Sequence, residues 1–161
     1  MSYEAVKRYF EAAGVEEKVF ELDSSSITID LAAKALGCVV GQAAKTMCFD
    51  VSNAPILIVA AGDAKIDNRK FREQFQQKAR MFPQDEVGVR VGHNPGALCP
   101  FAVNEGVQIY LDISLKRFET IFTAAGNEHS AAKVTLGELE EYSHADGWVD
   151  VCKGWYDNKA E

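Results

Sequence analysis

Apolar residues recur along the chain at two kinds of spacing, which divide it into helices and strands. A helical spacing predicts helices over 2–13, 29–36, 68–76, 84–90 and 135–142. Alternating or continuous apolar runs predict strands over 18–22, 45–50, 55–61, 79–82, 107–111, 119–123, 130–134 and 148–152. Helices and strands are mixed, and neither a repeat nor a linker separates them. The pattern therefore predicts one α+β domain over 1–155, followed by a frayed tail over 156–161.

Residues 42–50 contain the most unusual of these strands. Alternation of side chains places Lys45 on the same side as two apolar residues, Met47 and Phe49. An ammonium group on the core side of a strand is unusual, because burying it without a partner is costly. Lys45 either extends over its apolar neighbours to solvent, or lies at the mouth of a cleft where it holds an anionic or carbonyl-bearing ligand. The pattern alone leaves both interpretations open.

The second candidate feature is the irregular segment 92–101, which contains two of the four prolines. Within it, Gly96 and Pro100 frame a Gly-x-x-x-Pro loop. Glycine permits close approach of a ligand and proline stiffens the chain, so such a loop can aim backbone N–H groups at one oxygen, as an oxyanion hole does. The alternative is an ordinary connecting loop.

Cys99 and His93 are the third candidate feature, six positions apart in the same segment. A Cys-His pair would imply a thiol nucleophile. Cys99 has apolar neighbours and no catalytic signature, which favours a small apolar loop residue instead. The run 24–26, three serines, either caps a helix or binds hydroxyl groups of a ligand.

Composition limits the functional classes. The 161 residues, 47% of them apolar, suffice for one domain with a real core. No stretch approaches about eighteen apolar residues and the start lacks a signal-peptide layout, so we expect a cytoplasmic protein without a membrane partner. A formal charge of −7 argues against broad nucleic-acid binding, and we do not expect DNA as a partner.

Neither a metal nor a cofactor is expected. The four cysteines are far apart without a Cys-x-x-Cys motif, and the three histidines lack metal-ligand spacing. There is no Gly-Lys-Ser/Thr phosphate loop and no Gly-x-Gly-x-x-Gly motif, which argues against nucleotide hydrolases and dehydrogenases.

One segment is basic against this acidic background. Its cations between positions 65 and 80 are Lys65, Arg69, Lys70, Arg72, Lys78 and Arg80. The segment is either a solvated helix face or a localised site for phosphate contacts, and in the second case we expect Lys65, Arg69, Lys70 and Arg72 to make them.

Several short motifs occur in a specific order. They are Asp23-Ser-Ser-Ser-Ile-Thr-Ile-Asp-Leu-Ala-Ala, Ala44-Lys-Thr, Gly92-His, Gly96-x-x-Cys-Pro-Phe101, Val107-x-Ile-Tyr-Leu-Asp112-x-Ser-Leu-Lys-Arg-Phe, Ala124-Ala-Gly-Asn-Glu-His-Ser130-Ala and Trp148-Val-Asp-Val-Cys-Lys153. Together they resemble the YbaK/EbsC family of prolyl-tRNA-synthetase-associated editing domains over nearly the whole chain. Ser24-Ser25-Ser26 replaces the family's His-Pro stretch, and Ala97 replaces the loop's usual second glycine.

The resemblance implies a fold and a set of site residues. The implied fold has a central mixed, mostly antiparallel curved sheet flanked by helices. The implied catalytic residues are Lys45, Gly96, Ala97, Leu98, Cys99 and Pro100. The implied substrate-binding residues are Ser25, Ser26, Thr28, Thr46, His93, Asp112, Gly126 and Ser130.

The resemblance also implies a free-standing aminoacyl-tRNA deacylase that hydrolyses the ester of a mischarged tRNA, with tRNA(Pro) as the first expectation. Lys45 would anchor the substrate and backbone N–H groups of the loop would stabilise the oxyanion. The expected partner is the acceptor end of the tRNA, and an aminoacyl-tRNA synthetase is a candidate partner. Two other classes stay open: an inactive module that binds a tRNA end or a small ligand, and a thiol hydrolase that uses Cys99 and His93.

Overall fold

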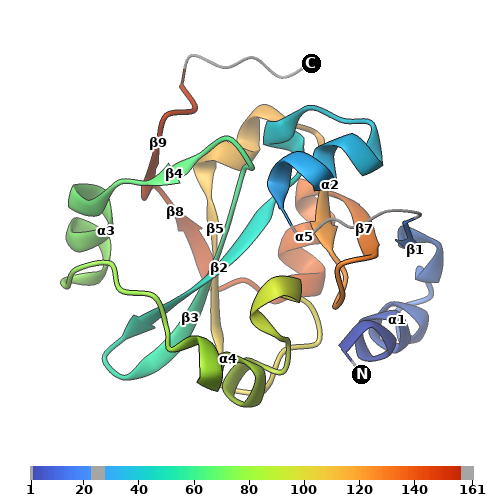
Figure 1. Cartoon of the computed structure of the whole chain (residues 1–161), viewed down its shortest axis with the longest axis horizontal. Helices are drawn as coiled ribbons and strands as arrows, with labels where there is room; N and C mark the ends of the chain where they lie inside the picture. The colour runs from blue at the N-terminus through green and yellow to red at the C-terminus, as the bar shows by residue number, and fades with distance from the viewer. Residues whose placement is uncertain (1, 23–27, 157–161) are drawn as a thin grey trace.

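Three sheets and five α-helices make up the computed structural model, which describes residues 2–22 and 28–156 (Figure 1). The helices are α1 (Ser2–Ala12), α2 (Ile29–Leu36), α3 (Asn68–Phe75), α4 (Gln84–Val91) and α5 (Leu136–Ser143). Four 3-10 helices accompany them: η1 (Glu16–Lys18), η2 (Val40–Gln42), η3 (Pro95–Ala97) and η4 (Ile113–Arg117).

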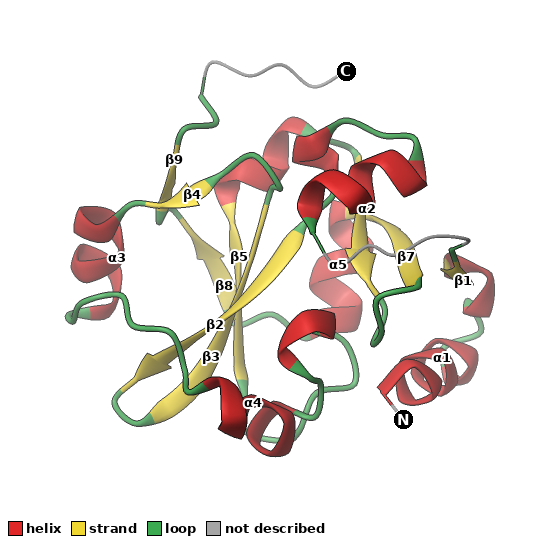
Figure 2. Ribbon diagram, in the orientation of Figure 1, coloured by secondary structure: helices red, strands yellow, loops and turns green. Residues whose placement is uncertain are grey.

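The largest sheet has four strands in the order β2-β3-β5-β8, with bounds Lys45–Val51, Ala54–Ala60, Gln108–Asp112 and Gly147–Val149. A second sheet has the order β1-β7-β6, with bounds Val19–Glu21, Ser130–Thr135 and Thr120–Ala124. The third pairs β4 (Lys65–Ile66) with β9 (Cys152–Lys153). Figure 2 shows the four-stranded sheet between α3 on one side and α1 and α2 on the other.

The α+β class and the mixed sheet are confirmed. Among the described strands, the pairings β1–β7, β2–β3, β4–β9 and β6–β7 are antiparallel, which makes antiparallel pairing the commoner kind. Within the four-stranded sheet, however, β5 runs parallel to both of its neighbours. β3 lies between β2 and β5 and is buried from Pro55 to Ala60, as its near-continuous apolar run predicts.

Local signals set the ends of the helices. The Thr28 hydroxyl accepts a hydrogen bond from the N–H of Leu31 at the start of α2, and Gly37 ends that helix in the left-handed conformation. Thr135 and Glu138 form the predicted capping box of α5, with bonds of 3.1 and 2.9 Å. Both ends of α2 and the start of α5 are therefore set by hydrogen bonds between residues that are close in the sequence.

Aromatic contacts join α1 to α5 and α3 to the four-stranded sheet. The Phe10 ring of α1 lies 5.0 Å from the Phe101 ring and 5.4 Å from the Tyr142 ring, between centroids. On the other side of the molecule, Phe49 of β2 lies 5.0 Å from Phe71 of α3. One core cluster includes the buried residues of this group and runs across the four-stranded sheet.

Two of the predicted strands are wrong in detail. The segment 79–82 is not a strand; it makes one isolated bridge between Met81 and Phe49. The predicted strand 148–152 is divided into β8 and β9, because Asp150 and Val151 turn the chain from one sheet to another. The two-residue strand β4 carries no periodic signal and was not predicted. Tyr156, the first residue of the predicted tail, donates a hydrogen bond to the Cys152 carbonyl.

Candidate functional site

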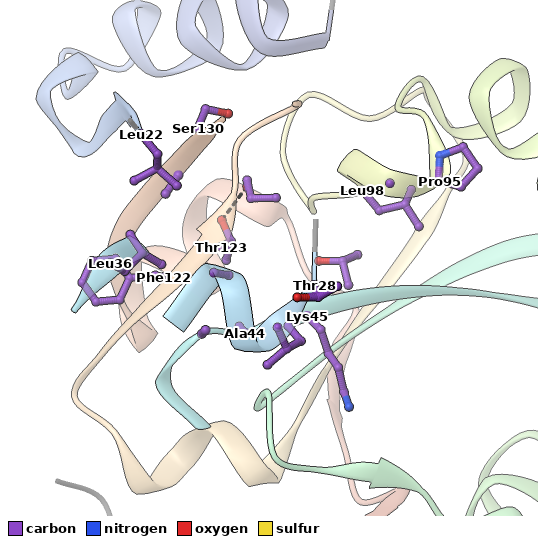
Figure 3. A pocket seen from close by; sticks show the side chains of 17 residues that line it. Leu22, Thr28, Leu36, Ala44, Lys45, Pro95, Leu98, Phe122, Thr123 and Ser130 are labelled. Atoms are coloured by element: carbon purple, nitrogen blue, oxygen red, sulfur yellow. Dashed lines mark hydrogen bonds between the residues drawn. The ribbon is translucent and has the colours of Figure 1, made fainter. Parts of the chain in front are cut away.

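A cavity of about 180 Å³ lies where α2, the start of β2, η3 and the paired strands β6 and β7 meet, and we call it the α2 cavity (Figure 3). Its 17 lining residues are Leu22, Thr28, Ile29, Ala32, Leu36, Ala43, Ala44, Lys45, Thr46, Pro95, Gly96, Leu98, Phe122, Thr123, Ala124, Ser130 and Ala131. Lys45 is the one ionisable side chain among these described residues, and most of the others are apolar.

The start of β2 reaches the cavity because it is bonded to the neighbouring sheet. The N–H of Ala44 donates to the Phe122 carbonyl at 2.8 Å, and Ala43 forms a parallel bridge with Phe122. This contact sets Lys45 and Thr46 beside Phe122 and Thr123, which are distant in sequence. Gly62 makes the junction possible, because a Cβ there would lie 2.2 Å from the Val40 carbonyl oxygen.

Six of the predicted site residues meet at this cavity: Thr28, Lys45, Thr46, Gly96, Leu98 and Ser130. They come from α2, β2, the η3 segment and β7. The structure thus brings together residues that are as far apart in the sequence as Thr28 and Ser130. Whether these residues act on a substrate stays a prediction.

The Lys45 side chain runs away from Leu98 and Pro95 (Figure 3), and its ammonium donates a hydrogen bond to the Ala64 carbonyl. Burial lowers the pKa of Lys45, and the Asp63 carboxylate opposes that shift. Neither interpretation of the sequence pattern describes this arrangement fully. The cation is neither extended into open solvent nor directed into the cavity; it is held at the cavity wall by a backbone oxygen.

The loop around Gly96 does not have the left-handed conformation that glycine often adopts. Gly96 is the middle residue of η3, a right-handed 3-10 turn with negative φ, so the left-handed conformation is not the reason for a glycine there. The Ala97 N–H already donates to the Asn94 carbonyl at 2.9 Å. The Gly96 N–H belongs to the first turn of the helix, where amides have no partner within the helix, and Gly96 lines the cavity. Gly96 is therefore a candidate backbone donor at the cavity.

His93 and Cys99 are both buried and neither lines the α2 cavity. His93 Nε2 lies 2.7 Å from the Phe101 carbonyl oxygen, which is only an acceptor, so we assign the ring proton to Nε2. The Cys99 sulfur lies 3.5 Å from the same nitrogen, which is then a donor and cannot take a proton from the thiol. Burial raises the pKa of Cys99 to about 12. This geometry disfavours a thiol nucleophile and gives His93 a structural role in closing the loop.

The remaining predicted residues lie elsewhere. Asp112 is fully buried, and its carboxylate accepts hydrogen bonds from the N–H groups of Ser114 and Val151, both at 2.9 Å. That arrangement joins β5 to the β8–β9 connection and indicates a structural residue. Pro100 is buried outside the cavity, Ala97 and Gly126 line a neighbouring cavity, and Ser25 and Ser26 lie outside the described residues.

Most of the basic segment lies on β4 and α3, and Figure 1 shows α3 at the opposite edge of the molecule from α2. Lys65 of β4 is nevertheless close enough to Lys45 to interact with its charge. Lys70 is already engaged: its ammonium bonds Asp150 at 2.9 Å and the Cys152 carbonyl at 3.2 Å, and it contacts the Tyr156 hydroxyl. Arg69 and Arg72 instead line a cavity of about 490 Å³ with Asn68, Lys78 and Ala79, which we call the α3 cavity. Lys65 is exposed on β4.

Sequence reasoning missed Thr123 and Phe122, which line the α2 cavity from β6. Thr123 is buried, and its hydroxyl donates to the Ala124 carbonyl at 2.8 Å (Figure 3). The hydroxyl of Ser130 donates to the Asn127 carbonyl at 3.3 Å. Alternation along 120–124 identifies Thr123 as facing inward, but nothing in the sequence says which cavity it faces.

Within residues 2–22 and 28–156, no helix is long and apolar enough to cross a membrane. Over the same ranges, no group of three or more His, Cys, Asp or Glu residues could hold a metal ion.

Comparison with known proteins agrees with the motif order. The uncharacterized protein YwhH of Bacillus subtilis strain 168 is 44% identical over 156 residues, covering 96% of this chain and 99% of its own. The proline–tRNA ligase of Staphylococcus aureus strain Newman is 29% identical over 115 residues, covering 68% of this chain and 20% of the ligase. The crystal structure of a protein proposed to be a trans-editing enzyme for prolyl-tRNA synthetase superposes with a TM-score of 0.84 at 27% identity, covering 95% of this chain and 98% of the other.

The family model for aminoacyl-tRNA editing domains matches residues 24–142. That segment contains α2, the Lys45 strand, η3 and both strands that line the α2 cavity. The chain is therefore a member of the aminoacyl-tRNA editing domain family.

Proposed function

We propose that this protein is an aminoacyl-tRNA deacylase that hydrolyses the ester of a mischarged tRNA within the α2 cavity. The observation that carries the proposal is the meeting of Lys45, the Gly96 amide and the polar residues of β6 and β7 around one small cavity. The similarity to a segment of proline–tRNA ligase, and to a structure proposed to act in trans for prolyl-tRNA synthetase, supports tRNA(Pro) as the tRNA.

The lining of the cavity supports a small, neutral amino acid. No carboxylate lines it among the described residues, so a lysyl or arginyl side chain would find no counter-charge. The wall formed by Leu22, Leu36 and Phe122 suits aliphatic atoms. A second hydrolytic site of this kind is useful because one binding site separates side chains that differ by a methylene by only about 1–3 kcal/mol.

The proposed reaction is attack of water on the ester carbonyl carbon. The carbonyl oxygen becomes an oxyanion, which accepts a hydrogen bond from the Gly96 N–H. The bond to the ribose oxygen then breaks, that oxygen takes up the proton that the attacking water releases, and the free amino acid leaves. Lys45 contributes positive potential at the cavity wall, where partial burial reduces screening by solvent. The ribose hydroxyl beside the ester positions the water, as the family resemblance suggests.

The test is single-turnover deacylation of Ala-, Cys-, Ser- and Thr-charged tRNA(Pro), with the same amino acids on tRNA(Thr). Gly96→Val should slow the reaction by about 100-fold or more, because the branched side chain crowds the donor amide. Lys45→Met should lower kcat/KM more than about tenfold. Cys99→Ser, which conserves volume, should leave turnover largely intact. Melting curves for all three variants exclude unfolding as the cause.

The outcomes separate the candidate functions. If no mischarged tRNA is hydrolysed, the protein is a binding module and the deacylase proposal fails. A Cys99→Ser protein that is slower than Gly96→Val would support the thiol hydrolase instead.

A further inference from the structure

The turn between β3 and β4, residues 61–64, carries two groups that act on the Lys45 ammonium. The Ala64 carbonyl accepts its hydrogen bond, and the Asp63 carboxylate is near enough to interact with its charge. A carbonyl oxygen leaves the net charge of the ammonium unchanged, whereas an ion pair with a carboxylate cancels most of its potential at a distance. The way this turn presents Asp63 therefore affects how much positive potential Lys45 contributes to the α2 cavity.

Arg117 of η4 holds the Asp63 carboxylate. Its Nη1 and Nη2 atoms donate to the two carboxylate oxygens at 2.8 and 2.5 Å. The guanidinium is itself held in place, because Nε donates to the Ser114 carbonyl at 3.0 Å and Nη1 also lies 3.5 Å from the Trp155 carbonyl oxygen. A planar guanidinium that makes these bonds has one orientation, so it holds the carboxylate against η4 in one orientation as well.

The turn is also attached to η4 by a contact that does not involve Arg117. The Ala61 N–H donates to the hydroxyl of the buried Ser114 at 3.0 Å. On the other side, Gly41 of η2 lies close to Asp63, since a Cβ on Gly41 would be 3.1 Å from both carboxylate oxygens. Loss of the arginine side chain therefore leaves the turn attached, and it chiefly changes the charge beside the ammonium.

The charges that act on Lys45 come from three other segments. Burial is the largest effect and lowers the pKa of Lys45; Cys152 of β9 and Asp63 oppose that shift, and Lys65 of β4 adds to it. Burial also raises the pKa of Cys152, so this group is a neutral thiol near pH 7. Asp63 is therefore the anion among these three groups near pH 7, and it is the group that Arg117 bonds.

We propose, on the basis of the deacylase function proposed above, that Arg117 is a positioning residue for Lys45. By holding the Asp63 carboxylate, it keeps the ammonium on the neutral Ala64 carbonyl with its charge available to the α2 cavity. Without Arg117, the carboxylate is no longer shared with a guanidinium, and it draws the ammonium toward the turn. The positive potential in the cavity then falls, and the oxyanion is stabilised less.

The first test measures the charge state of Lys45 directly, by NMR titration of protein labelled with ¹³C at lysine Cε. Lys45→Met identifies the signal. The midpoint should move to higher pH in Arg117→Gln and to lower pH in Asp63→Asn, because the first change strengthens the influence of the carboxylate and the second removes it. The double variant should lie between the two.

Arg8→Gln, which breaks an exposed pair with Glu4 on α1, is the control and should leave the midpoint unchanged. Asp63→Asn and the double variant keep the test decisive if Arg117→Gln does not fold. A midpoint that stays at the wild-type value in Asp63→Asn, or that moves in the same direction in both single variants, would overturn the proposal.

The second test is kcat/KM at pH 7 for the mischarged tRNA(Pro) that the wild type hydrolyses fastest. Arg117→Gln should lower kcat/KM about tenfold, and Asp63→Asn combined with it should restore most of the loss, because no carboxylate remains to draw the ammonium away. A residue that only stabilises the fold predicts no such recovery, so a double variant as slow as Arg117→Gln would refute the positioning role.

The two tests distinguish this proposal from the deacylase function. If the midpoints move as expected but the wild type hydrolyses no mischarged tRNA, Arg117 controls the charge of Lys45 and the deacylase proposal fails. If the wild type hydrolyses the ester and the midpoints do not move, the deacylase stands and the role of Arg117 is refuted.

Discussion

Arg117 and Asp63 form a doubly hydrogen-bonded ion pair that joins η4 to the turn after β3. Arg117 Nη1 lies 2.8 Å from Asp63 Oδ2, and Nη2 lies 2.5 Å from Oδ1. Both side chains are largely buried, with 13% and 17% of their surfaces exposed. The pair lies one residue from Ala64, whose carbonyl holds the Lys45 ammonium. The site is therefore supported by a charge pair that solvent screens poorly.

Arg117→Ala should destabilise the protein by about 3 kcal/mol, because it leaves a largely buried carboxylate without its guanidinium. Urea unfolding at pH 7 measures the effect. Arg8→Ala is the matched control, since Arg8 and Glu4 form an exposed pair at 3.8 Å and its loss should cost less than about 1 kcal/mol. Equal effects of the two substitutions on the free energy of unfolding would show that the buried pair stabilises the protein no more than the exposed pair does.

Gly62→Ala should destabilise the protein by about 3 kcal/mol, at the upper end of overpacking effects. The new Cβ would lie 2.2 Å from the Val40 oxygen and 2.6 Å from the Ala43 oxygen, both backbone atoms that cannot rotate away. Gly147→Ala, where a Cβ meets nothing within 4 Å, is the control and should leave the melting temperature nearly unchanged. A Gly62→Ala protein with the same melting temperature as the wild type would contradict the close approach of η2 to this turn.

Lys45 should make stability depend on pH in a defined direction. Its pKa in the folded protein lies below the ordinary value of 10.5, so the unfolded chain binds more protons between the two values. The free energy of unfolding of the wild type, relative to Lys45→Met, should therefore rise with pH through that window and level off above about 10.5. Cys152 interacts with Lys45, but burial raises the pKa of that thiol, so it stays protonated in the folded protein across this window. A difference that falls as pH rises would mean that the ammonium is stabilised in the fold.

One thiol should react much faster than the other three. Cys38 is half-buried, whereas Cys48, Cys99 and Cys152 are buried, and burial raises the pKa of Cys48 to about 11 and of Cys99 to about 12. A disulfide reagent at pH 8 should label Cys38 first and the others only as the protein opens. Cys38→Ser should remove the fast phase. If a fast phase survives in that variant, one of the buried thiols is more reactive than its surroundings imply.

The basic residues of α3 should affect the salt dependence of deacylation unequally. Arg69 and Arg72 line the α3 cavity with Lys78, so replacing both arginines with glutamine should reduce the slope of log kcat/KM against log salt by about one to two. Lys70→Met should instead lower thermal stability, because its ammonium holds Asp150 and the Cys152 carbonyl. An unchanged slope for the arginine variant would show that the α3 cavity is a solvated surface that makes no phosphate contacts.

Features that depend on neighbours in sequence were predictable. Thr28 and Gly37 delimit α2, and Thr135 and Glu138 cap α5, because the partner of each group lies within one helical turn. The strand buried on both faces was also predictable, from the apolar run 55–61. A segment that is buried along its whole length is apolar along its whole length, so its composition reveals the burial. The ordered motifs likewise identified the family from the sequence.

Tertiary structure alone decided where the chemistry lies. The direction of the Lys45 side chain depends on the Ala64 carbonyl, and the state of His93 depends on the Phe101 carbonyl, and neither acceptor can be recognised from residue type. Thr123 joins the α2 cavity only because β6 pairs with β7 and contacts the start of β2. Tyr3 meets the segment after α4 because aromatic packing seats α1 there. Periodicity states which face of an element is buried, but which surfaces meet is decided by packing between segments that are distant in sequence.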